Sequence, residues 1–179
     1  MPKESSLQVE ADRAPEEQRS GRTDLFLRHA PAALRLAFLL TGDRALAHDL
    51  VQDAFVRLFG RLLHLRNPDA FESYLRQTVV NLSRMHFRRK RVERTYLNRE
   101  QQRFQEEATS PDLDIREDLW QALLQLPERQ RVAIVLHFYE DLSEQQASEV
   151  LRCRPGTYRS LVSRGIAQLR ATVRGDQDA

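Results

Sequence analysis

The spacing of apolar residues predicts helices along most of the chain. From residue 23 to residue 40 these residues recur at helical intervals, and Gly42 ends the run. Pro31 lies inside this run and lacks an N–H to donate, so it predicts a kink or a division into two helices. A second helix is predicted from Asp43, a favourable N-cap residue, to about Leu65.

The second predicted helix has an apolar stripe that repeats every four residues, formed by Leu46, Leu50, Ala54, Leu58 and Leu62. Its other positions form either a solvated surface or a docking face. In the docking reading, Val51 and Phe55 are exposed beside polar groups, and exposed apolar side chains of this size often mark an interface. The polar residues concerned are Asp49, Gln52, Asp53 and Arg57. The spacing leaves both readings open.

A third helix is predicted after Asn67 and Pro68, with Asp69 as its cap. Its predicted buried side comprises Phe71, Tyr74, Leu75, Thr78, Val79 and Leu82. The end of this helix is strongly basic, with His86 and Phe87 interleaved among Arg84, Arg88, Arg89, Lys90, Arg91 and Arg94. The helix dipole accounts for one or two such cations. The full set favours a nucleic-acid backbone as partner.

Helical periodicity is lost between residues 96 and 113, where Gln and Glu accumulate, and a flexible acidic linker is predicted there. A second helical unit is predicted to begin near Asp114. Its first helix has an apolar side made of Leu119, Trp120, Leu123 and Leu126. Pro127 opens the next helix, whose candidate core residues are Val132, Ala133, Val135, Leu136 and Tyr139.

The stretch from residue 142 to residue 170 has the pattern of a helix-turn-helix. Ser143 and Gln146 have the spacing of a capping box, and Pro155 suits the first position of the second helix. The residues predicted to face inward on that second helix are Tyr158, Leu161, Val162, Ile166 and Leu169. Those predicted to face outward are Arg159, Ser160, Ser163 and Arg164.

The pattern alone leaves open whether this stretch is a DNA reader or an ordinary helical hairpin with a solvated basic face, and the distribution of charge bears on that choice. Residues 152–174 contain six arginines and no acid. A face that only confers solubility usually mixes signs, so charge of one sign favours a polyanion as partner. Because the net charge of the chain is only +2, any affinity for nucleic acid must come from such segregated patches.

Composition excludes several other classes of protein. Cys153 is the only cysteine, which excludes an internal disulfide and a cysteine-based zinc site and fits a reducing cytoplasm. No apolar run approaches the roughly 20 residues that span a bilayer. Residues 1–22 lack the apolar core of a signal peptide and are predicted to form a disordered polar extension. We therefore expect a cytoplasmic protein.

Three segments, in order along the chain, resemble the extracytoplasmic-function (ECF) class of bacterial sigma factors. The first, LLTGDRALAHDLVQDAFVRLF, resembles the family's segment that docks on the RNA polymerase clamp. The second, FESYLRQTVVNLSRMHFRRKR, resembles its promoter-melting segment. The third, LPERQRVAIVLHFYEDLSEQQASEVLRCRPGTYRSLVSRGIAQLR, resembles its upstream-element reader. The resemblance extends over about residues 23–174.

The resemblance implies an all-α fold of two small helical domains joined by a flexible linker. A region-2-like domain is expected at 23–95, the linker at 96–113 and a region-4-like helix-turn-helix domain at 114–174, with a tail at 175–179. The implied function is to bind core RNA polymerase and to direct initiation at promoters through their minus-ten and minus-thirty-five elements. An anti-sigma factor is a further partner that the resemblance allows. No cofactor, catalytic activity, membrane insertion or small-molecule substrate is expected.

The resemblance also assigns roles to particular positions. The polymerase-docking motif matches Asp49, Leu50, Gln52, Asp53 and Phe55, which favours the docking reading of the second helix. The segment that holds the non-template strand of the minus-ten element matches Asn81, Arg84, Arg88 and Arg89. The recognition helix for the minus-thirty-five element matches Thr157, Arg159, Ser160, Ser163 and Arg164.

Several positions depart from the family pattern, among them Ala147, where a large apolar residue is usual, and Ser148, where alanine is usual. Arg152 stands in the turn where glycine is common, so a positive φ at this position would be strained. Arg154 stands where a Ser, Thr or Asp usually caps the recognition helix, and it cannot accept a hydrogen bond from an N–H. Met85 stands where an aspartate is frequent, and this bears on the detail of minus-ten recognition.

Two other classes of function are the alternatives. One is a helix-turn-helix regulator that acts without stoichiometric binding of core polymerase and uses residues 1–96 for sensing or dimerisation. The sequence signals no effector pocket for such a sensor. The other is an enzyme, but the five histidines lack metal-ligand spacing, Cys153 lacks a catalytic partner, and there is no glycine-rich phosphate loop.

Overall fold

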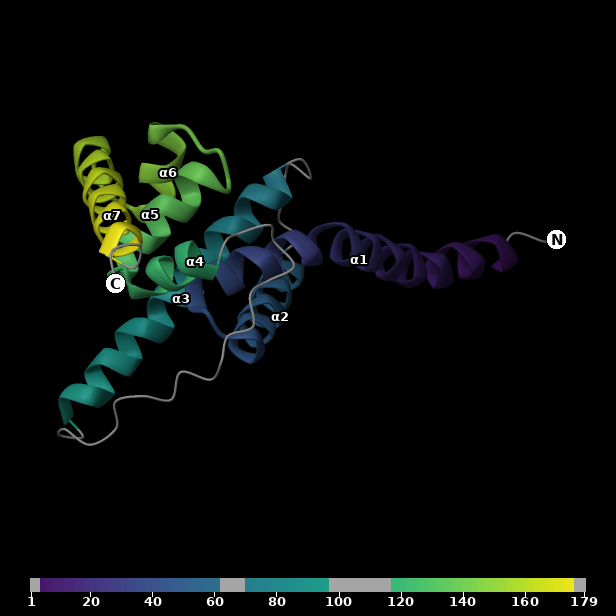
Figure 1. Ribbon diagram of the computed structural model, residues 1–179. Helices are drawn as coiled ribbons and strands as arrows, with labels where there is room; N and C mark the ends of the chain where they lie inside the picture. The colour runs from purple at the N-terminus through teal and green to yellow at the C-terminus, as the bar shows by residue number, and fades with distance from the viewer. Residues whose placement is uncertain (1–3, 62–69, 97–116, 176–179) are drawn as a thin grey trace.

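The computed structural model describes residues 4–61, 70–96 and 117–175, and within these ranges it contains seven helices and no strand. The N-terminal unit consists of α1 (Glu4–Thr41), α2 (Arg44–Arg61) and α3 (Phe71–Tyr96). The C-terminal unit consists of α4 (Glu117–Gln125), α5 (Glu128–Phe138), α6 (Glu144–Leu151) and α7 (Pro155–Gly175) (Figure 1). The predicted all-α class is confirmed. The predicted linker and the predicted cap Asp69 lie outside the described residues.

The continuity of α1 differs from two sequence predictions. Pro31 neither divides nor ends the helix. Its neighbourhood is exposed, so water can reach the carbonyl of Leu27 that loses its usual N–H partner. Residues 4–22, predicted to be disordered, continue the same helix, which extends away from the other helices (Figure 1). Their many Glu, Gln, Arg and Ala residues are good helix formers.

The start of α2 is as predicted, but its buried face is wider. The Asp43 carboxylate accepts a hydrogen bond of 2.9 Å from the backbone N–H of Leu46, which confirms the cap. The prediction that Val51 and Phe55 are exposed is wrong, since each is only 3% exposed. Phe55 packs its ring 4.9 Å from that of Phe26, because α2 lies against both α1 and α3 and one stripe of side chains cannot cover two neighbours.

The buried face of α3 is only partly as predicted. Its buried apolar residues include Phe71, Leu75, Val79 and Leu82. Tyr74 was predicted to be buried but is 49% exposed, and its place towards the core is taken by Val80 and Ser83 on the adjoining side. The Ser83 hydroxyl is satisfied within the helix, since it donates to the carbonyl of Val79 at 2.9 Å.

The C-terminal unit packs around α5. Val132, Ala133, Val135 and Leu136 are buried as predicted, with Ile134 also inside. α7 crosses α5 closely at Gly165, where an added Cβ would lie 2.8 Å from the Ile134 side chain, so only glycine fits without movement. Trp120 and Leu123 of α4 are buried, as is Leu126 just beyond its end, but Leu119 is 42% exposed and was wrongly predicted to face the core.

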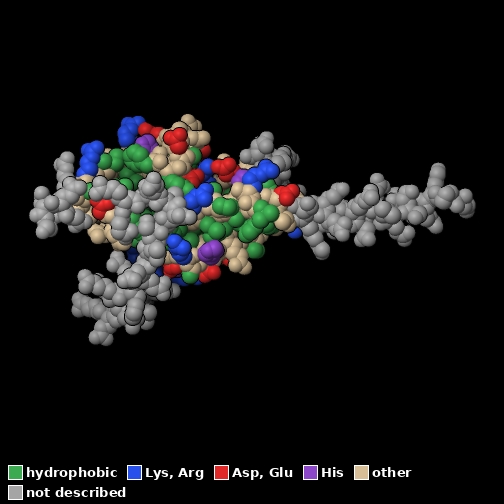
Figure 2. Space-filling view, turned by 45° about the vertical axis from the view of Figure 1, so that its right-hand side comes forward, with side chains coloured by type: hydrophobic (Ala, Val, Ile, Leu, Met, Phe, Trp, Pro, Cys, Tyr) green, Lys and Arg blue, Asp and Glu red, His purple; other side chains and the backbone are tan. Residues whose placement is uncertain are grey.

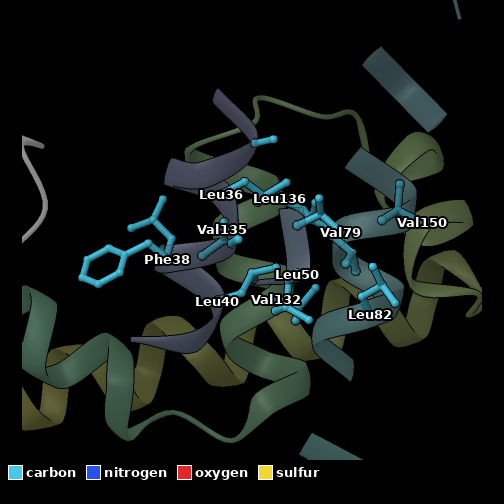
Figure 3. Packing of buried hydrophobic residues seen from close by; sticks show 14 of the residues in the cluster. Leu36, Phe38, Leu40, Leu50, Val79, Leu82, Val132, Val135, Leu136 and Val150 are labelled. Carbon is cyan, nitrogen blue, oxygen red and sulfur yellow. The ribbon is translucent and has the colours of Figure 1, made fainter. Parts of the chain in front are cut away.

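The two units share one hydrophobic core. Figure 3 shows side chains of α1, α2 and α3 packed with those of α5 and α6. Phe38 of α1 stacks on Trp120 of α4, with ring centroids 4.9 Å apart. At the end of α1, Gly42 has φ +74°, and a Cβ added there would lie 2.7 Å from the side chain of Leu124. The periodicity of the sequence predicted two separate units, and it did not predict that the units would pack against each other.

Candidate polymerase and nucleic-acid interfaces

The predicted docking residues of α2 fall into two groups. Asp49, Gln52 and Asp53 are exposed on one face of the helix. Leu50 and Phe55 are buried against α1 and α3 and do not reach the surface. Leu50 is buried as its place in the apolar stripe predicted, whereas Phe55 was predicted to be exposed and is buried. The two apolar residues hold the helix in place, and the three polar ones lie at its surface.

The predicted strand-holding residues of α3 lie in different surroundings. Arg88 and Arg89 are exposed, whereas Asn81 and Arg84 are half-buried. Arg84 Nη1 donates to the carbonyl of Leu151 at 3.2 Å, and its Nε lies 4.0 Å from the Glu128 carboxylate. Arg88 and Arg89 are therefore accessible to a phosphate, while Arg84 is held against the C-terminal unit.

Glu128 and Arg131 form a partly buried charged centre beside Arg84. Burial raises the pKa of Glu128 above its usual value, although Arg84 and other arginines oppose the shift. Burial also lowers the pKa of Arg131 to about 10, so this guanidinium remains charged at neutral pH. Arg131 donates to the carbonyl of Leu40 at 3.0 Å and to that of Leu124 at 2.8 Å. It thus binds the ends of α1 and α4 together.

The helix-turn-helix has the predicted local geometry. The Ser143 hydroxyl accepts from the N–H of Gln146 at 3.3 Å, and the Gln146 side chain accepts from the N–H of Ser143 at 3.0 Å, which confirms the capping box. Arg152 ends α6 with φ +49° and ψ +53°, the left-handed conformation for which glycine is suited. Pro155 begins α7, as predicted.

Arg159, Ser160, Ser163 and Arg164 of α7 are exposed, as predicted, and Thr157 is exposed as well. Arg159 is paired with Glu144 of α6, with Nη2 and Oε1 2.9 Å apart. Because this pair is at the surface, its strength is small and a phosphate or base can displace it. Arg164 Nε donates to the carbonyl of Ser160 at 3.1 Å, which orients the guanidinium along the helix.

The inward side of α7 is fixed by Tyr158. Its ring is buried, and its hydroxyl donates to the carbonyl of Ala133 on α5 at 3.4 Å. Burial, with a smaller effect of the Glu144 charge, raises the pKa of Tyr158 to about 12, so the phenol stays neutral. This anchor sets which residues of α7 face outward.

Side chains that join the two units were missed by sequence reasoning. Arg76 of α3 forms an ion pair with Glu140, 64 residues later in the chain, and Gln77 donates to the carbonyl of Val150 at 2.9 Å. Neither helical periodicity nor a local motif signals such contacts, because they depend on how the units pack.

The described surface shows no single dominant charged patch on the face in Figure 2, where Lys and Arg side chains lie among Asp and Glu. Within the described residues, no group of three or more His, Cys, Asp or Glu side chains could hold a metal ion. None of the helices in this part of the chain is both long and apolar enough to cross a membrane.

Comparison with known proteins identifies both units. Residues 25–93 match the family model of sigma-70 region 2, and residues 116–169 match that of sigma-70 region 4. The chain is 30% identical over 149 residues to the RNA polymerase sigma-E factor of Streptomyces coelicolor, covering 83% of this chain and 84% of that protein. It is 35% identical over 153 residues to the ECF RNA polymerase sigma factor SigE of Mycolicibacterium smegmatis, covering 82% of this chain but only 59% of that protein.

Among solved structures, the fold is similar to the sigma factor RpoE of Bartonella quintana in complex with the anti-sigma factor NepR. The TM-score is 0.64 and the identity 26%, with 85% of this chain and 96% of that chain covered. It is also similar to CnrH in complex with the cytosolic domain of CnrY, with a TM-score of 0.62, at an identity of 22% that shows the fold alone. The chain belongs to the ECF class of RNA polymerase sigma factors, whose regions 2 and 4 bind core polymerase and the minus-ten and minus-thirty-five promoter elements.

Proposed function

We propose that this chain binds core RNA polymerase through α2 and positions it at promoters through α3 and α7. The observation that carries the proposal is the match of both halves to sigma-70 regions 2 and 4, in the order that a sigma factor requires. The chain supplies binding groups and the polymerase performs the chemistry. It acts where the polymerase is, in the cell interior.

The polymerase surface in this proposal is the exposed polar face of α2. Asp49, Gln52 and Asp53 supply carboxylate and amide groups that accept or donate hydrogen bonds without rearrangement of the core. Leu50 and Phe55 contribute indirectly, because their burial fixes the rotation of α2. A rigid helix face of this kind loses little conformational entropy on binding.

The minus-ten surface in this proposal is the outer side of α3. Arg88 and Arg89 are placed to contact phosphates, while the amide of Asn81 can bond to the edge of a displaced base. Arg84 joins this set once its bond to the C-terminal unit is broken. Region boundaries in this proposal are residues 23–95 for the polymerase and minus-ten unit and 114–174 for the minus-thirty-five unit.

The minus-thirty-five surface in this proposal is the outer side of α7, with Thr157, Arg159, Ser160, Ser163 and Arg164. The first residues of a recognition helix reach base edges, and later ones meet the backbone. Two arginines and three hydroxyls provide the donors and acceptors that a major groove requires.

An anti-sigma factor is part of the proposal as a regulatory partner. It is supported by the likeness to a sigma factor solved with the anti-sigma factor NepR. A protein that occupies the α2 face or the α7 face would lower transcription by this chain in a purified system, and adding excess chain would restore it.

In vitro transcription with purified core polymerase and a genomic library tests the proposed function. We expect transcripts from a defined set of promoters only when the chain is present, and stoichiometric co-purification of chain and core. A chain that binds duplex DNA but neither co-purifies with core nor starts transcripts is instead a helix-turn-helix regulator. The variant Asp49→Ala with Asp53→Ala serves as the matched negative control for polymerase binding.

A further inference from the structure

The outer face of α3 carries an apolar side chain that the packing of the core does not explain. Met85 is 54% exposed, whereas Leu82 and Ser83 close to it on the helix are buried. It follows Asn81 by four residues and precedes Arg88 by three, so these three side chains share one face of α3. Because Asn81 and Arg88 belong to the proposed minus-ten surface, Met85 lies in the middle of that surface.

The surroundings of Met85 along α3 are cationic. Residues 73–92 contain five arginines, one lysine and no acid. The C-terminal end of α3 also projects away from the other helices, which leaves space for a strand beside it (Figure 1). An aspartate at position 85, which is frequent in the family, would repel the phosphates that Arg88 and Arg89 attract. With Met85 in its place, this attraction is unopposed.

A thioether and a carboxylate recognise different parts of a base. A carboxylate accepts hydrogen bonds from amino groups, such as N4 of cytosine, so it discriminates among the bases. The methionine side chain is unbranched and polarisable, and it packs favourably against aromatic rings. Every base presents such a ring face, and contacts with it tolerate any sequence. Met85 is therefore suited to hold a base without reading its edge.

The spacing along α3 places this apolar group between two polar contacts. A rise of 1.5 Å per residue puts Met85 about 6 Å from Asn81 and about 4.5 Å from Arg88 along the helix axis. The Asn81 amide can bond to a base edge, and the exposed Arg88 guanidinium can meet a phosphate. The side chain between them is left to contact the face of a base.

We propose that Met85 is a specificity-determining residue, which packs on the face of one displaced base and makes that position of the minus-ten element tolerant of all four bases. The inference rests on the proposed function, since it requires α3 to hold the displaced strand. Selectivity then comes from Asn81, and affinity comes from the exposed arginines. The chain accepts promoters that differ at this one position of the element.

Binding of single-stranded oligonucleotides to the holoenzyme tests the proposal. The full chain is assembled with purified core polymerase. The probes carry the non-template strand of a minus-ten element found by in vitro transcription, with each of the four bases at each position. We expect one position at which the parent binds all four bases within about twofold. Met85→Ala should lower affinity about two- to tenfold, equally for the four bases at this position.

Three further variants separate the contact with the base face from a general effect. Met85→Asp should weaken binding of every probe and create a preference of about three- to tenfold for cytosine over thymine at the tolerant position. Met85→Leu keeps an apolar side chain of similar volume and should bind like the parent, within about twofold. Leu119→Ala removes an exposed apolar side chain from α4 and should leave every affinity unchanged. Circular dichroism confirms that each variant is folded.

Oxidation of the thioether provides a second measurement. The chain has only two methionines, Met1 and Met85. Hydrogen peroxide transfers one oxygen atom to the sulfur and is reduced to water, which leaves a polar sulfoxide. Treatment of the free chain before assembly should lower probe affinity by about as much as Met85→Ala. The same treatment of Met85→Leu should have no effect, which excludes Met1 and Cys153 as the cause.

Three results would overturn the inference. They are an unchanged affinity of Met85→Ala, a loss of affinity confined to one base, and no new preference in Met85→Asp. Failure of the proposed function has a different signature, because the chain then forms no holoenzyme or the holoenzyme binds no probe. A holoenzyme whose probe binding is weakened by Arg88→Ala but not by Met85→Ala upholds the proposed function and removes this inference alone.

Discussion

Arg152 adopts a conformation that its side chain disfavours. Its φ of +49° places it in the left-handed region, where a Cβ costs about 1–2 kcal/mol. Arg152→Gly removes this strain but makes the unfolded chain more flexible. We expect a net gain of about 0.5–1 kcal/mol in the free energy of unfolding, measured by urea titration. Arg170→Gly, at an exposed position inside α7, should instead lower stability by a similar amount. A loss at Arg152 would contradict the strain.

Arg159 and Arg164 test the reading of DNA at the residue scale. Arg159 lies near the start of α7, so Arg159→Ala should cost about 1–3 kcal/mol and relax preference at one position of the minus-thirty-five element. Arg164→Ala should weaken binding to all duplexes alike and reduce the salt slope by about one. Titration of matched and altered duplexes at several salt concentrations measures both. Equal behaviour of the two variants would remove the distinction.

Glu144 offers an independent check on the same surface. It is paired with Arg159 in the free chain and would also repel a nearby phosphate. Glu144→Gln should therefore raise duplex affinity by about two- to fivefold, since the surface pair is worth only about 0.2–1 kcal/mol. When Glu144→Gln is combined with Arg159→Ala, the gain in duplex affinity that remains measures only the repulsion between Glu144 and a phosphate. If Glu144→Gln lowers affinity, then the carboxylate orients Arg159 for binding instead of competing for it.

At the scale of elements, signals between residues close in sequence predicted where helices begin. The packing of one helix against two others could not be predicted in this way. The capping box at Ser143, the cap at Asp43 and the start of α7 at Pro155 involve neighbours in sequence, and all three are present. The burial of Val51 and Phe55 depends on α2 lying against two helices at once, which one apolar stripe does not reveal.

Exposed and buried residues of α2 should respond differently to substitution by alanine. Asp53→Ala removes an exposed carboxylate, so it should weaken binding of core polymerase while changing stability by less than about 0.5 kcal/mol. Phe55→Ala empties a buried site and should cost about 3–5 kcal/mol of stability. Calorimetry of unfolding and a core-binding assay together distinguish the two. Normal core binding by folded Asp53→Ala would remove this carboxylate from the interface.

At the scale of the whole molecule, the two family regions do not behave as independent bodies. Each has its own helices, but one continuous core includes α1 to α3 and α4 to α7. The sequence indicated two domains because helical periodicity is interrupted between residues 96 and 113, and an interruption in the pattern carries no information about packing across it. The contact of Phe38 with Trp120 therefore could not be predicted from the sequence pattern and is seen only in the structure.

The single tryptophan of the chain makes this shared core measurable. Trp120 belongs to the C-terminal unit and stacks on Phe38 of the N-terminal unit, so its fluorescence should change together with far-ultraviolet circular dichroism in one urea transition. Phe38→Ala leaves a cavity and should lower stability by about 3–5 kcal/mol, shifting both signals equally. Val56→Ala, at an exposed position of α2, should shift neither by more than about 0.5 kcal/mol. Two separate transitions, with the effect of Phe38→Ala confined to one, would mean that the units unfold independently.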